Sequence, residues 1–129
     1  SGTFDSSGRA FAAAKTTGLA GPLLGPQDAF RHCVWNCFMA QEMGASEAEK
    51  FGTAHENSNP SSIRFDNQMD LHNNAIGRSL GIAGADCETE CRNAVTSGRL
   101  RTIRGPDTTP QATPPVPRPC IGASDQPWP

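Results

Sequence analysis

All three histidines of the chain lie in short stretches that also carry acids, amides or arginines. These stretches are residues 31–35, 54–57 and 69–78. Imidazole and carboxylate groups that fold together can bind a divalent metal ion, or they can transfer protons as a base and its orienting partner. Because the two ends of the chain hold no histidine, the clustering predicts a catalytic site in the middle of the chain.

Helical spacing would gather these groups into two stripes. One-turn spacing puts Asp28, His32 and Trp35 on one face of a helix. The second stripe consists of Asp70, Asn73, Asn74 and Gly77. Asp, Asn and Gly are poor residues for the middle of a helix, so a sequence that keeps them there gains something other than stability. The stripes therefore favour a functional site.

Each of these residues also has a structural alternative. A histidine on a helix can be a hydrogen-bonded packing residue, and His55 can interact favourably with the dipole at the end of its helix. Asp70 can cap a helix that starts late, and the two asparagines after it can mark a turn. Arg31 and Arg78 can form surface ion pairs, each worth less than about 1 kcal/mol.

Taken in order, the three stretches resemble an uncharacterised domain family found at the C-termini of bacterial polymorphic toxins, including Rhs-repeat, wall-associated and type VI secretion effector proteins. The family pattern is D-A-F-R-H-x-x-W, then H-E, then M-D-L-x-N-N-x-x-G-R, and the match spans residues 28–81. The matched positions are Arg31, His32, Trp35, His55, Glu56, Asp70, Asn73, Asn74, Gly77 and Arg78. His72 falls at a variable position of the third motif and is therefore not counted among the site residues.

The resemblance implies a toxin domain that is released into a rival bacterium and neutralised by a cognate immunity protein. It supplies no reaction, so the chemistry has to come from the residues. We expect a hydrolase whose catalytic residues are His32, His55, Glu56, Asp70 and Asn74. We expect its substrate-binding residues to be Arg31, Trp35, Asn73 and Arg78.

Two hydrolytic mechanisms fit these residue types. In the first, His32, His55 and Asp70 bind one divalent metal ion, and Glu56 acts as general base on the metal-bound water. In the second, one histidine activates water or a hydroxyl group, and Asp70 orients its imidazole. Asn74 and Arg78 then hold the developing oxyanion. The chain has no G-x-S-x-G, Walker, dinucleotide-binding or H-E-x-x-H motif, which argues against those enzyme classes.

The cysteines form two pairs with the same spacing, Cys33 with Cys37 and Cys87 with Cys91. A spacing of four puts both thiols of a pair on one helix face, so two antiparallel helices would form the disulfides Cys33–Cys91 and Cys37–Cys87. A zinc site or four free thiols are the alternatives, although zinc ligands usually have other spacings. A histidine-bearing helix linked in this way is similar in arrangement to secreted phospholipase A2, but the H-D pair and calcium loop of those enzymes are missing.

The pattern along the chain predicts an all-α fold, a small bundle of four to five helices with two interhelical disulfides and an extended Pro-rich C-terminal arm. We expect a Gly/Pro-rich lead-in over residues 1–26 with a short helix at 9–15, a catalytic domain over 27–104 and a Pro-rich tail over 105–129. The strong helices are expected at 28–44, with Asp28 as N-cap, from 46, after 66 and at 86–96. Residues 99–104 are expected to form a short strand or extended arm.

The cysteines and the net charge limit the cellular compartment and the substrate class that we expect. Disulfides form in oxidising environments, so we expect a secreted, monomeric protein that acts in the periplasm of target bacteria. The formal charge of −2 disfavours broad contact with nucleic acid. We therefore favour a lipid or lipid-linked substrate, with peptidoglycan next. A nuclease toxin and a non-enzymatic binding or membrane-disrupting module are the alternatives. Cys120 has no pairing partner within the chain and is either free or intermolecular.

Overall fold

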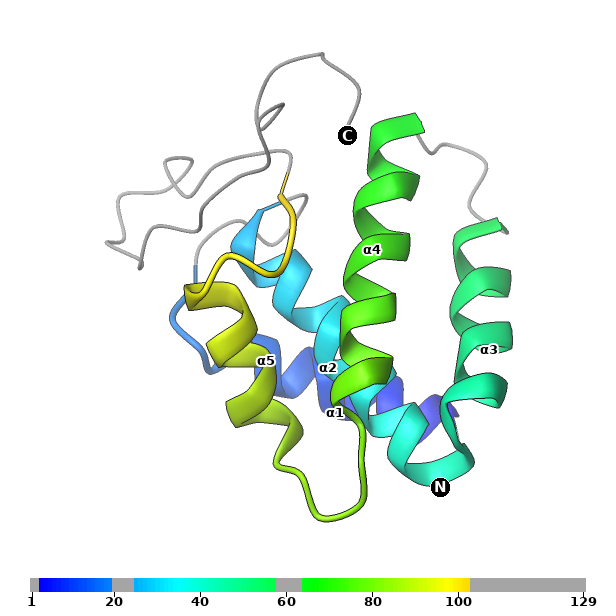
Figure 1. Cartoon of the computed structure of the whole chain (residues 1–129). Helices are drawn as coiled ribbons and strands as arrows, with labels where there is room; N and C mark the ends of the chain where they lie inside the picture. The colour runs from blue at the N-terminus through cyan, green and yellow to red at the C-terminus, as the bar shows by residue number, and fades with distance from the viewer. Residues whose placement is uncertain (1–2, 20–24, 58–63, 103–129) are drawn as a thin grey trace.

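The computed structural model describes residues 3–19, 25–57 and 64–102, with side chains described from residue 6 and outside 55–57 and 64–66. Within these residues it has five helices and no strand. The helices are α1 (Thr3–Lys15), α2 (Pro26–Met43), α3 (Ala45–Asn57), α4 (Arg64–Leu80) and α5 (Cys87–Thr96). The predicted all-α bundle is confirmed (Figure 1). None of the described helices is both long and apolar enough to cross a membrane.

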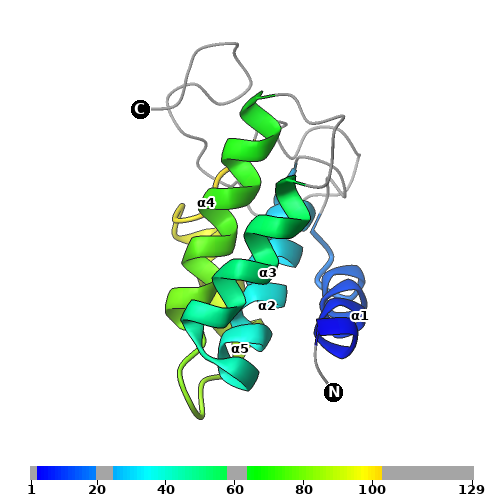
Figure 2. The same ribbon diagram turned by 90° about the vertical axis from the view of Figure 1, so that its right-hand side faces the viewer.

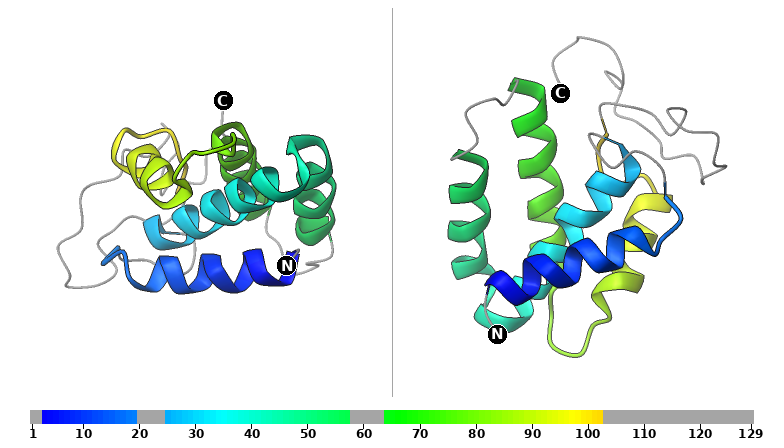
Figure 3. Two further views of the ribbon diagram at one scale, coloured as in Figure 1. Left: turned by 90° about the horizontal axis from the view of Figure 1, so that it is seen from below. Right: turned by 180° about the vertical axis from the view of Figure 1, so that it is seen from behind.

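Helix α2 is the centre of the bundle, because it contacts each of the other four helices. Helix α1 covers one side of α2, and α4 and α5 lie on the opposite side (Figure 3). Helix α3 runs beside α4 at one edge (Figure 2). The core is rich in alanine and cysteine, and Phe30, Val34 and Leu100 are among its few large apolar side chains.

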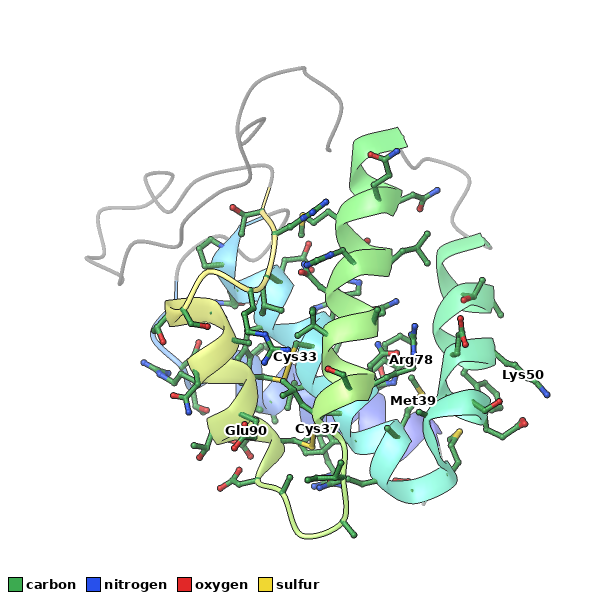
Figure 4. All side chains as sticks on the ribbon, in the orientation of Figure 1. Cys33, Cys37, Met39, Lys50, Arg78 and Glu90 are labelled. Carbon is green, nitrogen blue, oxygen red and sulfur yellow. A yellow bond between two sulfur atoms is a disulfide. The ribbon has the colours of Figure 1, made fainter. Side chains whose placement is uncertain are left out.

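Two disulfides join α2 to α5, and both are the predicted pairs. Cys33 is bonded to Cys91 and Cys37 to Cys87, with Cα–Cα distances of 5.9 Å and 5.7 Å. The first cysteine of one helix pairs with the second of the other because the two helices are antiparallel. Cys33 and Cys37 lie on the side of α2 that faces α5 (Figure 4). The bonds place the folded chain in an oxidising environment, outside the reducing cytosol.

Two glycines of α4 allow it to lie against the backbone of α2. A Cβ atom on Gly77 would overlap the carbonyl oxygen of Cys33. A Cβ atom on Gly81 would lie only 2.6 Å from the carbonyl oxygen of Cys37. The two helices run in the same general direction at this contact, since Cys33 meets Gly77 and Cys37 meets Gly81. A side chain at either glycine position would therefore push the helices apart.

Helix starts differ from the sequence prediction in ways that affect the site. Helix α2 begins at Pro26 with Gly25 as its N-cap, so Asp28 lies in the first turn and is not the cap that its residue type suggested. Helix α4 begins at Arg64, which puts Asp70 well inside the helix and removes its capping alternative. By contrast, Asp86 does cap α5, through hydrogen bonds from the backbone of Glu88 and Thr89.

The chain after α5 turns back along α4. Residues 99–102 form neither helix nor strand and bend at Leu100, so the short-strand alternative does not hold for this part of the segment. Leu100 and Thr102 of this segment are buried. The Pro-rich tail predicted over 105–129, Cys120 included, lies outside the described residues.

Substitution of Gly77 by Ala should destabilise the bundle by about 2–3 kcal/mol, because the new methyl group forces α4 away from α2. Gly8→Ala is the matched control, since nothing lies within 4 Å of a Cβ atom at Gly8 in α1. That change should be neutral or stabilising by up to about 1 kcal/mol. Urea unfolding of the oxidised proteins measures both. Equal stability of the Gly77→Ala variant and the wild type would show that the helices are not in this close contact.

Candidate functional site

Polar residues face one another along the contact between α2 and α4, and we call this set the polar seam. It consists of Asp28, His32 and Asn36 of α2 and Asp70, Asn74 and Arg78 of α4. Both triplets have a spacing of four residues, so each forms one stripe along its helix. Of the stripe predicted on α4, Asp70 and Gly77 meet α2, whereas Asn73 faces the segment after α5 and Arg78 joins the stripe one turn beyond Asn74.

The first half of the polar seam is a histidine between two carboxylates. The His32 Nε2 atom lies 3.5 Å from Asp70 Oδ2, and the His32 Nδ1 atom lies 3.3 Å from Asp28 Oδ1. His32 is 4% exposed, Asp28 is 3% exposed and Asp70 is 15% exposed. Burial of an ionisable group costs free energy unless the group is paired. A buried histidine between two carboxylates is therefore a candidate functional site. Asp70 is the most exposed member of this group.

The protonation of His32 follows from its contact with the backbone. Its Nδ1 atom lies 3.0 Å from the carbonyl oxygen of Asp28. A carbonyl oxygen can only accept, so Nδ1 carries the hydrogen and donates it. The remaining nitrogen, Nε2, faces the Asp70 carboxylate. In the neutral imidazole, the lone pair of Nε2 is therefore available to a proton or a metal ion at this position.

Arg31 extends this cluster toward α1. Its guanidinium donates to Asp28 Oδ1 at 2.8 Å and lies over the Phe11 ring, 4.7 Å from its centroid. The predicted substrate-binding residue Arg31 is thus placed against a buried carboxylate of the cluster. Trp35, also predicted to bind substrate, lines a small hollow together with Arg31 and with Ser7 and Ala10 of α1.

The second half of the polar seam is closed by α3. Arg78 donates through Nη1 to Asn36 Oδ1 at 3.3 Å, and Asn36 Nδ2 donates to the carbonyl oxygen of His32 at 3.0 Å. Gly52 of α3 lies directly over this pair, since a Cβ atom there would be 2.9 Å from Asn36 Oδ1 and 3.4 Å from Asn74 Nδ2. Burial lowers the pKa of Arg78, whereas the negative charge of Glu49 acts to raise it. Figure 4 shows Arg78 in the space between α4 and α3.

Asn73 is occupied by the segment that follows α5. Its side-chain amide donates to the carbonyl oxygen of Arg101 at 2.9 Å and accepts from the Arg101 backbone N–H at 2.8 Å. Asn73 is fully buried, so the structure gives this predicted substrate-binding residue a structural contact. His72 beside it contacts the carbonyl oxygen of Arg99 at 2.9 Å. Burial lowers the pKa of His72, and the hydrogen bond to Arg99 opposes that shift.

His55 and Glu56 belong to the last turn of α3, and their side chains lie outside the described residues. Their backbone positions along α3 are described. Gly52 lies beside Asn74 and Arg78, and α3 runs antiparallel to α4 (Figure 2). The turn that follows Gly52 therefore lies toward the Asp70 end of α4. The backbone puts His55 and Glu56 at the end of α3 nearer to the histidine cluster.

Two members of the polar seam were not predicted as site residues, Asp28 and Asn36. The sequence placed Asp28 both at the N-cap of its helix and on the stripe with His32, without a catalytic or ligand role. Asn36 lies between two cysteines, and its spacing of four from His32 places it on the same stripe. Of the metal ligands expected, His32 and Asp70 are brought together. Within the described side chains, the third acid or imidazole group close to these two is Asp28.

A known protein family matches the part of the chain that contains the polar seam. A family model described as a domain of unknown function, DUF6973, matches residues 3–100. The matched region contains all five helices, both disulfides and every residue of the polar seam. No solved structure matches the chain.

Replacement of Asn73 by Ala should release residues 99–102 from α4, because both hydrogen bonds to Arg101 are lost. We expect the free energy of unfolding to fall by about 1–3 kcal/mol. We also expect amide hydrogen exchange at Arg101 to accelerate. Asn93→Ala, at an exposed position of α5, is the control and should leave that exchange unchanged. Unaltered protection of the Arg101 amide in Asn73→Ala would show that Asn73 does not hold this segment.

Proposed function

The chain belongs to the DUF6973 family, and we propose that it is a secreted hydrolase that acts on the bacterial cell envelope as an antibacterial toxin domain. The observation that supports hydrolysis most directly is the buried His32, held between the carboxylates of Asp28 and Asp70. Asp28 orients the His32 imidazole from one side, and the second ring nitrogen faces the partly exposed Asp70 carboxylate. A base held in this way can activate water. The toxin role rests on the resemblance of the three motifs to polymorphic toxin domains.

In the proposed mechanism, Asp28 and its carbonyl group orient the imidazole, and the pair of His32 Nε2 and Asp70 activates a water molecule. The water oxygen bonds to the electrophilic carbon or phosphorus of the substrate, and its proton passes to the His32–Asp70 pair. The bond to the leaving group breaks, and the leaving group receives that proton. Arg78, two turns farther along the same stripe of α4, supplies the positive charge that would stabilise the oxyanion, whereas Asn74 is fully buried beneath Gly52 of α3.

The proposed substrate is a lipid or a lipid-linked envelope component, with peptidoglycan as the second choice. The two disulfides support an oxidising compartment, and the periplasm of the target bacterium is the one that contains these substrates. A producer cell that makes such an enzyme needs protection. The proposal therefore includes a cognate immunity protein that binds the toxin domain.

Export of the chain to the periplasm of a test bacterium should kill it, whereas the same chain kept in the cytoplasm should be harmless. Asp70→Asn and His32→Gln should each reduce killing at least about 100-fold, because a paired base loses most of its rate when either member is removed. Asp86→Asn is the matched control, since asparagine caps a helix as well as aspartate does. Circular dichroism on all variants reports whether the fold is kept.

Three outcomes would contradict the proposal. Killing from the cytoplasm would favour a nuclease, and unchanged killing by Asp70→Asn would place the reaction elsewhere. Membrane leakage without any cleaved lipid or muropeptide would favour a non-enzymatic module. Mass spectrometry of envelope extracts distinguishes released fatty acids, phosphate-containing head groups and peptidoglycan fragments.

His55 and Glu56 can be tested in the same assay without any assumption about their side-chain positions. His55→Ala should abolish killing while the domain stays folded, whereas His72→Ala should have little effect on killing, because His72 contacts Arg99 and not the His32 cluster. If His55→Ala kills at the wild-type dose, His55 has no part in the reaction.

A further inference from the structure

We propose that the cluster of Asp28, His32 and Asp70 binds one first-row divalent cation such as Zn²⁺. This inference deepens the proposed function, because it assigns a cofactor to the same site. The binding itself, however, requires no substrate and no activity. One ligand atom from each of the three residues lies within 4.8 Å of the other two. His32 Nε2 and Asp70 would bind the ion directly, and Asp28, which lies at the other ring nitrogen, would orient the imidazole.

The distance between His32 and Asp70 fits a shared ion better than a direct hydrogen bond. His32 Nε2 and Asp70 Oδ2 are 3.5 Å apart, which is long for a hydrogen bond between nitrogen and oxygen. Two ligand atoms that each lie about 2.0–2.1 Å from a tetrahedral zinc ion are separated by about 3.4 Å. The ion would therefore occupy the space between these two atoms with little change in the positions of α2 and α4.

The contacts of the other imidazole nitrogen support the same assignment. Metal-bound histidines usually donate their second ring N–H to a carbonyl or carboxylate, which orients the ring and increases the basicity of the ligating nitrogen. His32 Nδ1 does this with the carbonyl oxygen of Asp28, at 3.0 Å. The Asp28 carboxylate lies beside the same nitrogen and is itself held by Arg31. The ring is thus fixed before any ion binds.

Charge and donor type indicate which cation fits. The Asp28 carboxylate is already paired with Arg31, so the Asp70 carboxylate beside the buried imidazole is the charge that a divalent cation would balance, in a place that excludes most water. One nitrogen ligand favours zinc and its first-row neighbours over Mg²⁺ and Ca²⁺, which prefer oxygen ligands alone. Asp70 is partly exposed, so a water molecule can reach the ion from that side. A bound ion of this kind would make water a stronger nucleophile at neutral pH.

The test is a calorimetric titration of the full oxidised chain with ZnCl₂, followed by elemental analysis after dialysis. The protein carries Cys120→Ser, because a free thiol would also bind zinc. We expect about one ion per chain and a rise in melting temperature with zinc. His32→Gln and Asp70→Asn should each weaken binding at least about tenfold and remove the rise. Asp86→Asn and His72→Gln are the matched acid and histidine controls and should bind as the parent does.

The proposal is overturned if the parent chain binds no zinc, if both site variants bind as tightly as the parent, or if the controls lose binding equally. A preference for Mg²⁺ or Ca²⁺ over Zn²⁺ would also overturn it. Its failure is distinct from failure of the proposed function. If killing requires Asp70 but persists when the protein is ion-free and a chelator is present, the cation proposal fails and the hydrolase proposal stands. If zinc binds at the site but no hydrolysis is found, the cation proposal stands and the hydrolase proposal fails.

Discussion

The close contact between α2 and α4 at Gly77 and Gly81 is the constraint on which the rest of this structure depends. The absence of side chains at these two positions lets the backbone of α4 rest on the carbonyl groups of Cys33 and Cys37. Only at this separation can the carboxylate of Asp70 reach the imidazole of His32. Larger side chains at these two positions would separate the two polar stripes and expose their polar groups to solvent.

A polar seam through the centre of a small bundle contributes little to its stability. Burial of Asp28, His32 and Asn36 displaces apolar contacts from the very helix that organises the core. The two disulfides offset that loss, because each closes a long stretch of chain and restricts the unfolded state by about 2–4 kcal/mol. Both bonds start from α2, on residues adjacent to the polar stripe. The oxidised frame and the polar site are therefore parts of one arrangement.

Much of the fold could be predicted from spacing alone. The two cysteine pairs allowed one antiparallel pairing, and the polar stripe of α4 follows from the helical period, so neither required knowledge of tertiary contacts. The partner of that stripe could not be predicted, because the choice between α2, α3 and α5 depends on where glycines permit close approach. Asp28 was interpreted as a cap because its residue type suits one. The structure instead places the cap at Gly25 and Asp28 beside the imidazole.

The central claim is that His32 is fixed in one tautomer, with Nδ1–H bonded to the backbone and Nε2 directed at Asp70. Nitrogen-15 NMR of the imidazole in the oxidised protein measures this state directly. We expect a protonated, slowly exchanging Nδ1, and an Nε2 resonance that shifts in Asp70→Asn but not in Asp86→Asn. A His32 ring with Nδ1 unprotonated, or with Nε2 indifferent to Asp70, would contradict the account.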